Sequence, residues 1–188
     1  MNTSNAIVLG SLGDIAARDG MSLAESFINA DAMILVDCSA SMDCTDSRGG
    51  RRRFDVALEE LAMLQQRMPG KIAVIAFSGS VQFVPGGQPP FFGGSTNLAE
   101  ALRFAKVADI PGMRFVVISD GEPDDAKGAL AVAATYQNRI DTVFVGPEMH
   151  PSGRRFLEQL ATAKGGQSVT ADRAQELAAK TEQILLGA

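Results

Sequence analysis

Two short stretches of the chain carry oxygen-bearing side chains directly after runs of apolar residues. In the first stretch, Asp37, Ser39 and Ser41 occupy alternate positions after the apolar run 32–36. Alternate residues of an extended chain point to the same side, so we expect one carboxyl and two hydroxyl groups to face the same point. Asp-x-Ser-x-Ser is a weak signal alone, because Asp and Ser also favour turns after strands.

The second of these stretches and one further segment offer the same kind of oxygen donor. Asp120 ends another apolar run, and Thr96 lies directly before a segment with helical periodicity. In an open parallel sheet, ligands bind beyond the carboxyl ends of the strands, where the winding direction reverses. If the strands that end at Asp37 and Asp120 are neighbours, the three segments converge on one site.

The chemistry of these donors indicates the kind of ion that they would bind. All are hard oxygens, which favour Mg²⁺, Mn²⁺ or Ca²⁺ over zinc or copper. Two carboxylates only neutralise a divalent cation, so the metal could still accept an anionic oxygen, which we expect from an Asp or Glu of a partner. The predicted metal site consists of Asp37, Ser39, Ser41, Thr96 and Asp120.

Short apolar runs alternate with longer segments of helical periodicity, which is typical of a parallel sheet covered by helices. We therefore predict an α/β fold with a Rossmann-like, open, mostly parallel six-stranded sheet and helices on both faces. The run 81–84 follows its predecessor after three residues, too few for a crossover, and is predicted as an antiparallel edge strand. The predicted strands are 32–37, 71–77, 81–84, 114–119, 140–145 and 167–170.

Apolar residues spaced three or four positions apart predict the helices. Ser22 and Glu25 form a capping box at the start of one helix, and Asn97 can cap another, with Glu100 three residues later. Gly20 is expected to separate the first two helices. The predicted helices are 12–18, 22–29, 54–68, 98–105, 124 or 125 to about 138, 152–163 and 172–186.

These motifs together resemble the von Willebrand factor type A (vWA) domain and its metal-ion-dependent adhesion site. Asp37-x-Ser39-x-Ser41 matches the first metal motif of the family, Thr96 matches its threonine, and Asp120, followed by glycine, matches its last aspartate. The resemblance implies direct metal ligation by Ser39, Ser41 and Thr96, with Asp37 and Asp120 often acting through water. It also implies a switch: without a ligand, Asp120 binds the metal directly while Thr96 moves away.

The resemblance also divides the chain and suggests a function. It begins near residue 31, so we expect an N-terminal helical extension over 1–30, packed on a vWA domain over 31–188. The implied function is a non-enzymatic, metal-dependent protein–protein interaction module whose metal is completed by an Asp or Glu carboxylate of the partner. Many bacterial relatives work beside MoxR-type AAA+ ATPases or inside larger cytoplasmic assemblies, which suggests a partner of that kind.

Composition excludes several other classes of protein. The chain has 188 residues, is 46% hydrophobic and carries a net charge of −5, which predicts one globular domain without the basic face of a nucleic-acid binder. No apolar run approaches the roughly 20 residues of a membrane span. The first ten residues contain no basic side chain, so we expect no secretion signal and a cytoplasmic location. Cys38 and Cys44 are too few for a disulfide framework or zinc site.

Two enzyme-like alternatives start from the same strand ends. A metal-dependent phosphohydrolase could use Asp37 as its nucleophile. The pattern of haloacid-dehalogenase enzymes, however, has an acid two residues later, where this chain has Ser39, and no lysine follows at a suitable strand end. A nucleotide-binding fold is the second alternative, but no glycine-rich fingerprint follows the first predicted strand and the chain has no Gly-Lys-Ser/Thr motif. We therefore expect that the protein is not an enzyme.

Two neighbouring features have simpler interpretations. The basic residues Arg48 and 51–53 are interpreted as a solvated helix start, with a partner-binding or phosphate-binding patch as the alternative. Asp43 and Asp46 are interpreted as part of a charged surface loop, with added charge near the metal as the alternative. Cys38 lies between two candidate ligands, but alternation directs it towards the core.

Overall fold

A computed structural model describes residues 7–147 and 151–171. Six strands form one sheet in the order β3-β2-β1-β4-β5-β6, and every neighbouring pair is parallel except β2 and β3. This architecture confirms the predicted α/β class and the antiparallel edge strand. The strands are β1 (Ala32–Asp37), β2 (Ile72–Phe77), β3 (Val81–Phe83), β4 (Arg114–Ser119), β5 (Ile140–Phe144) and β6 (Ser168–Thr170).

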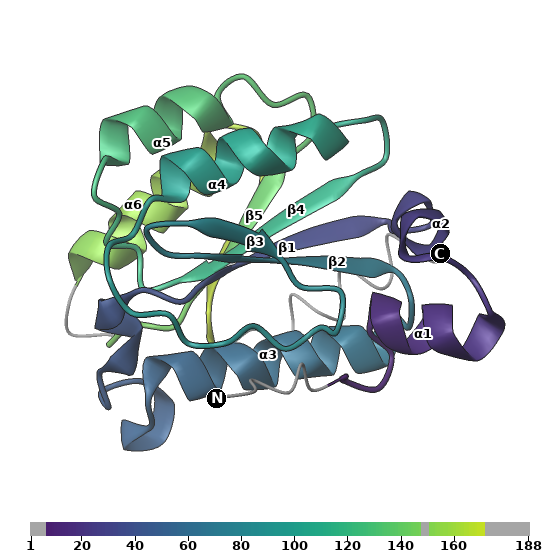
Figure 1. The fold of residues 1–188 in the computed structure, drawn as a ribbon. Helices are drawn as coiled ribbons and strands as arrows, with labels where there is room; N and C mark the ends of the chain where they lie inside the picture. The colour runs from purple at the N-terminus through teal and green to yellow at the C-terminus, as the bar shows by residue number, and fades with distance from the viewer. Residues whose placement is uncertain (1–6, 148–150, 172–188) are drawn as a thin grey trace.

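Helices lie on both faces of this sheet (Figure 1). The α-helices are α1 (Leu12–Asp19), α2 (Leu23–Ile28), α3 (Arg53–Arg67), α4 (Leu98–Ala105), α5 (Ala126–Ala133) and α6 (Pro151–Thr162). The 3₁₀ turns are η1 (Ala40–Asp43), η2 (Arg48–Gly50) and η3 (Lys106–Ala108). The helix predicted over 172–186 lies outside the described residues. Within the described ranges, no helix combines the length and the apolar character that a membrane span requires.

Strand β1 shows how the core is built. Met33 and Leu35 join the cluster formed with α4, α5 and α6 on one face, whereas Ile34 and Val36 join the cluster formed with α3 on the other. Successive side chains of a strand point to opposite faces, so a strand covered on both sides is apolar throughout. Every residue of β1, β2 and β4 is buried. Packing on both faces therefore fixes the position of the central strands and of the residues at their carboxyl ends.

Helix α5 differs from its prediction, because it ends at Ala133 rather than near Asn138. The carboxylate of Asp109 accepts the backbone N–H of Gln137 at 2.6 Å and of Asn138 at 3.1 Å. These bonds occupy donors that a continuing helix would use internally. Tyr136 is buried and donates its hydroxyl proton to a carbonyl oxygen of α4 at 2.6 Å. Tertiary hydrogen bonds therefore turn the chain away from the helix axis.

The first helix, α1, packs on the body of the fold. Leu12 is 1% exposed and belongs to the core cluster, and the backbone N–H of Gly13 donates to the carbonyl oxygen of Pro85 at 2.8 Å. Gly20 ends α1 in the left-handed conformation with φ of 68°, and the predicted capping box begins α2. Helix α1 is thus tied to the body of the protein through its backbone as well as its apolar face.

Candidate metal site

The two central strands bring the first candidate ligand beside an unpredicted partner. Strands β1 and β4 are parallel neighbours, and Asp37 and Ser119 are the last residues of each. The Ser119 hydroxyl donates to Asp37 Oδ2 at 2.7 Å, and the Ser39 N–H donates to Asp37 Oδ1 at 2.9 Å. Both oxygens of the buried Asp37 carboxylate therefore accept a hydrogen bond, which holds it at the sheet edge.

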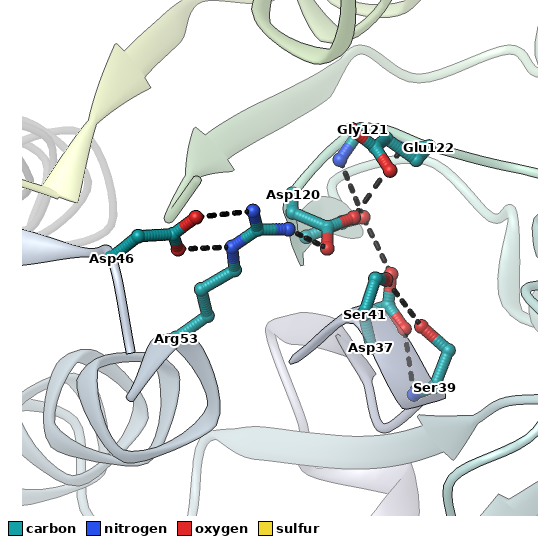
Figure 2. A network of polar contacts seen from close by, with 9 residues as sticks. Asp37, Ser39, Ser41, Asp46, Arg53, Asp120, Gly121 and Glu122 are labelled. Carbon is teal, nitrogen blue, oxygen red and sulfur yellow. Dashed lines mark hydrogen bonds and ion pairs between the residues drawn. The ribbon is translucent and has the colours of Figure 1, made fainter. Parts of the chain in front are cut away.

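The two serines of the first motif come together as predicted. Ser39 Oγ and Ser41 Oγ lie 3.2 Å apart, just beyond the end of β1 (Figure 2). Adjacent ligands of an octahedral Mg²⁺ ion at 2.0–2.1 Å would be about 3 Å apart. Ser39 is 0% exposed. The hydroxyl pair therefore fits two neighbouring positions of one small divalent ion.

Asp120 supplies the second carboxylate at this edge and is 2% exposed. Burial, and secondarily the charge of Asp120, raise the pKa of Asp37 to about 6, although the hydrogen bonds of Ser39 and Ser119 oppose this rise. In the part of the chain that the structure describes, no basic side chain forms an ion pair with Asp37. A divalent cation would relieve the repulsion between the two carboxylates.

The loop of Thr96 is bonded to the segments on both sides of the site. The Thr96 N–H donates to Asp124 Oδ2 at 3.0 Å, and the Asp124 N–H donates back to the Thr96 carbonyl oxygen at 3.1 Å. Gly94 accepts the N–H of Ala40 through its carbonyl oxygen at 3.0 Å. Thr96 itself is 5% exposed. The three sequence segments thus converge at one edge of the sheet, as predicted, and Asp124 is an additional positioning group.

Arg53 corrects the interpretation of the basic residues. It begins α3 and is 6% exposed, so it is not part of a solvated helix start. Its Nη1 donates to Asp120 Oδ2 at 2.7 Å, while Nε and Nη2 donate to the two oxygens of Asp46 at 2.7 and 2.8 Å (Figure 2). The hydrogen bonds that Arg53 donates to Asp46, and then the one that it donates to Asp120, raise its pKa against the effect of burial. Asp46 is thus a specific ion-pair partner rather than only a loop charge.

The sequence reasoning missed Ser119 and Arg53 for different reasons. Ser119 directly precedes Asp120 and ends the strand beside β1, so its position in the predicted sheet was an available signal. Arg53 left no comparable signal, because it meets Asp120 across 67 residues of sequence. Cys38, by contrast, is 0% exposed in the core, as alternation predicted.

The donor set agrees with a hard cation rather than with zinc or copper. Across residues 7–147 and 151–171, no group of three or more His, Cys, Asp and Glu side chains could hold a metal ion. The side-chain donors that could complement Asp37 and Asp120 at this edge are therefore the hydroxyl groups of Ser39, Ser41 and Thr96. Oxygen donors of this kind suit Mg²⁺, Mn²⁺ and Ca²⁺.

Comparison with known proteins identifies the fold. No family model and no curated protein matches the chain. An aerotolerance-related membrane protein from Bacteroides fragilis NCTC 9343 is 18% identical, with a TM-score of 0.65 over 81% of this chain and 96% of that one. A von Willebrand factor type A protein from Catenulispora acidiphila is 16% identical, with a TM-score of 0.56 over 80% of this chain and 41% of that one.

A third similar structure is loaded with a metal ion. The manganese-loaded TRAP protein of Plasmodium vivax is 15% identical, with a TM-score of 0.54 over 79% of this chain and 71% of that chain. At such identities the likenesses establish the fold alone. The chain therefore has the vWA fold, in agreement with the resemblance of its motifs.

Proposed function

Because the chain has the vWA fold, we propose that it is a metal-dependent interaction module that binds a divalent cation and, through it, a carboxylate of a protein partner. The observation that carries this proposal is the pair of hydroxyl oxygens, Ser39 Oγ and Ser41 Oγ, 3.2 Å apart beside the buried carboxylate of Asp37. A buried carboxylate with a raised pKa and two adjacent hydroxyl groups has no evident use in packing alone.

Each residue has a proposed role towards the ion. Ser39, Ser41 and Thr96 would bind it directly, and Asp37 and Asp120 would hold it through water. The bound ion would supply a Lewis-acidic position that accepts one anionic oxygen. Mg²⁺ is the proposed physiological ion, with Mn²⁺ or Ca²⁺ as substitutes, and the manganese in the TRAP structure supports Mn²⁺ as an experimental probe.

The proposed partner is a protein that presents an Asp or Glu at its surface. From the resemblance of the motifs, we propose a MoxR-type AAA+ ATPase or another component of a cytoplasmic assembly as the kind of partner. Nucleic acid is not proposed, because the net charge is −5 and opposes phosphate binding.

The geometry of Asp37 argues against the phosphohydrolase alternative. A nucleophilic carboxylate needs an oxygen that can approach the phosphorus atom of a substrate. Asp37 is 0% exposed, and its two oxygens accept hydrogen bonds from Ser39 and Ser119. The same arrangement suits a carboxylate that orients metal-bound water.

Calorimetric titration with Mn²⁺ and Mg²⁺ tests the metal site. We expect the wild type to bind one ion and Ser39→Ala to lose at least about tenfold in affinity. Thr162→Ala is the matched control, because it also removes a hydroxyl group and Thr162 is an exposed residue at the end of α6, outside the candidate set. Equal affinity in Ser39→Ala and the wild type would remove the basis of the proposal.

A second measurement separates binding from catalysis. We expect the Mn²⁺-loaded protein to bind acetate, a minimal carboxylate, and to lose that binding in excess chelator. A generic phosphatase assay with p-nitrophenyl phosphate should show no turnover. Turnover that disappears in Asp37→Asn would instead favour the phosphohydrolase.

A further inference from the structure

A buried guanidinium group lies beside the candidate metal site without being a candidate ligand. The side chain of Arg53 is 7% exposed, and its ion-pair partners differ sharply in exposure, with Asp120 at 1% and Asp46 at 41%. Burying an arginine carries a large desolvation cost unless its donors are paired. The three hydrogen bonds to these carboxylates, each 2.7 or 2.8 Å long, offset that cost and hold the guanidinium in place.

This contact determines the orientation of Asp120. Its Oδ2 accepts the proton of Arg53 Nη1, and its Oδ1 accepts the N–H of Glu122 at 3.3 Å. The guanidinium is planar, and its donors have fixed directions, so it restricts the carboxylate more than a lysine would. Each oxygen still has a lone pair for a water molecule or an ion. Asp120 therefore faces the site in one orientation, with part of its hydrogen-bonding capacity already used.

The same contact changes the charge that a bound metal would experience. Asp37 and Asp120 alone would neutralise a divalent cation. The positive charge of Arg53 offsets that of Asp120 at close range, in a buried setting where solvent screens it little. Asp46 balances Arg53 from the more exposed side, where screening is stronger. A metal at the site would therefore retain net positive charge.

We propose that Arg53 is a positioning residue that tunes this site for anionic ligands. By orienting Asp120 and offsetting its charge, Arg53 weakens the binding of the cation and strengthens the binding of an anionic oxygen to the cation once it is bound. This inference rests on the proposed function of the site. It assigns the preference for a carboxylate partner to a residue outside the candidate ligand set.

The test measures two affinities in the same variants. Arg53→Met removes the charge while keeping a long side chain, and Arg53→Lys keeps the charge but loses the planar fork. Calorimetry gives the affinity for Mn²⁺, and water-proton relaxation of the Mn²⁺-loaded protein gives the affinity for acetate. We expect Arg53→Met to bind Mn²⁺ roughly tenfold more tightly and acetate roughly tenfold more weakly. Arg53→Lys should lie between this variant and the wild type.

The opposite signs distinguish this role from a structural one. If Arg53 served folding alone, both affinities would fall together with the melting temperature, and this result would overturn the inference. Arg103→Met is the matched control, because Arg103 forms an exposed ion pair with Glu100, and both affinities should stay at the wild-type level. If a folded Arg53→Met variant bound both Mn²⁺ and acetate with wild-type affinity, the inference would also be refuted.

A second variant covers the case in which Arg53→Met does not fold. Asp46→Asn keeps Arg53 and removes the carboxylate that balances it, so the site should become more positive. We expect weaker Mn²⁺ binding and tighter acetate binding, the reverse of Arg53→Met, and the opposite result refutes the inference. Absence of Mn²⁺ or acetate binding in the wild type would refute the proposed function itself, which is a separate outcome.

Discussion

Replacing Asp37 by asparagine tests whether the buried carboxylate, which we propose serves a bound cation, lowers the stability of the metal-free protein. Asp37 is 0% exposed, and burial together with the charge of Asp120 raises its pKa from 3.8 to about 6. Asparagine has nearly the same shape and keeps an oxygen that can accept the Ser39 N–H. It carries no charge, so it avoids both the desolvation and the repulsion.

The sign of the effect follows from proton binding in the two states. Between about pH 4 and 6, the folded state holds the Asp37 proton more tightly than the unfolded state, so stability falls as the pH rises. The loss of stability caused by ionising Asp37 is absent below about pH 4 and complete above about pH 6. At about 1.4 kcal/mol per pH unit, the change from 3.8 to about 6 corresponds to roughly 3 kcal/mol.

We therefore expect Asp37→Asn to be more stable than the wild type by up to about 3 kcal/mol at pH 7.5 in chelator. Urea denaturation followed by circular dichroism measures this difference, and at pH 4 the two proteins should be equally stable. Added Mg²⁺ should stabilise the wild type, since a ligand that binds only the folded state raises the free energy of unfolding, and should leave Asp37→Asn unchanged.

Asp109→Asn provides a control of opposite sign. Burial opposes ionisation of Asp109, but hydrogen bonds from Gln137, Asn138 and Lys106 outweigh it and lower its pKa. Its replacement should therefore destabilise the protein at pH 7.5. If Asp37→Asn proves no more stable than the wild type in chelator at pH 7.5, or keeps its gain at pH 4, the reasoning about Asp37 is refuted.

Three further predictions concern individual positions in the fold. Gly121→Ala should destabilise the protein by about 3 kcal/mol or more in urea denaturation, because φ is 76° and a Cβ there would overlap the Gly153 backbone; wild-type stability would contradict this. Tyr136→Phe should cost about 1–3 kcal/mol by losing a buried hydrogen bond, and an unchanged midpoint would show that the bond contributes nothing. Cys44 is exposed and Cys38 is buried, so Ellman's reagent should modify one thiol in the native protein and two in urea; rapid reaction of both natively would exclude the buried position.

Much of the fold could be predicted because its signals are local. An apolar run such as 32–37 has strand length, and the capping box at Ser22 and Glu25 is complete within four neighbouring positions. The predicted site depended on the condition that β1 and β4 are neighbours, and the observed strand order meets that condition. Short-range periodicity and capping therefore located most elements to within one or two residues.

The end of α5 could not be predicted, because it depends on a distant carboxylate. Nothing in the segment after Ala133 forbids a longer helix, and apolar and helix-compatible residues continue there. Asp109 accepts the N–H groups of Gln137 and Asn138 from more than 25 residues away in the chain, and these bonds decide the boundary. Tertiary hydrogen bonds of this kind override local propensity.

For the candidate site, the sequence by itself determined which oxygen donors are present and that they follow strands. Side-chain alternation within 37–41 is a local property, so the convergence of Ser39 and Ser41 could be anticipated. Only the tertiary structure decided that Arg53 is buried against Asp120 rather than solvated. The physical reason is that an ion pair depends on position in space, and the register between α3 and the sheet edge is set by packing across the whole core.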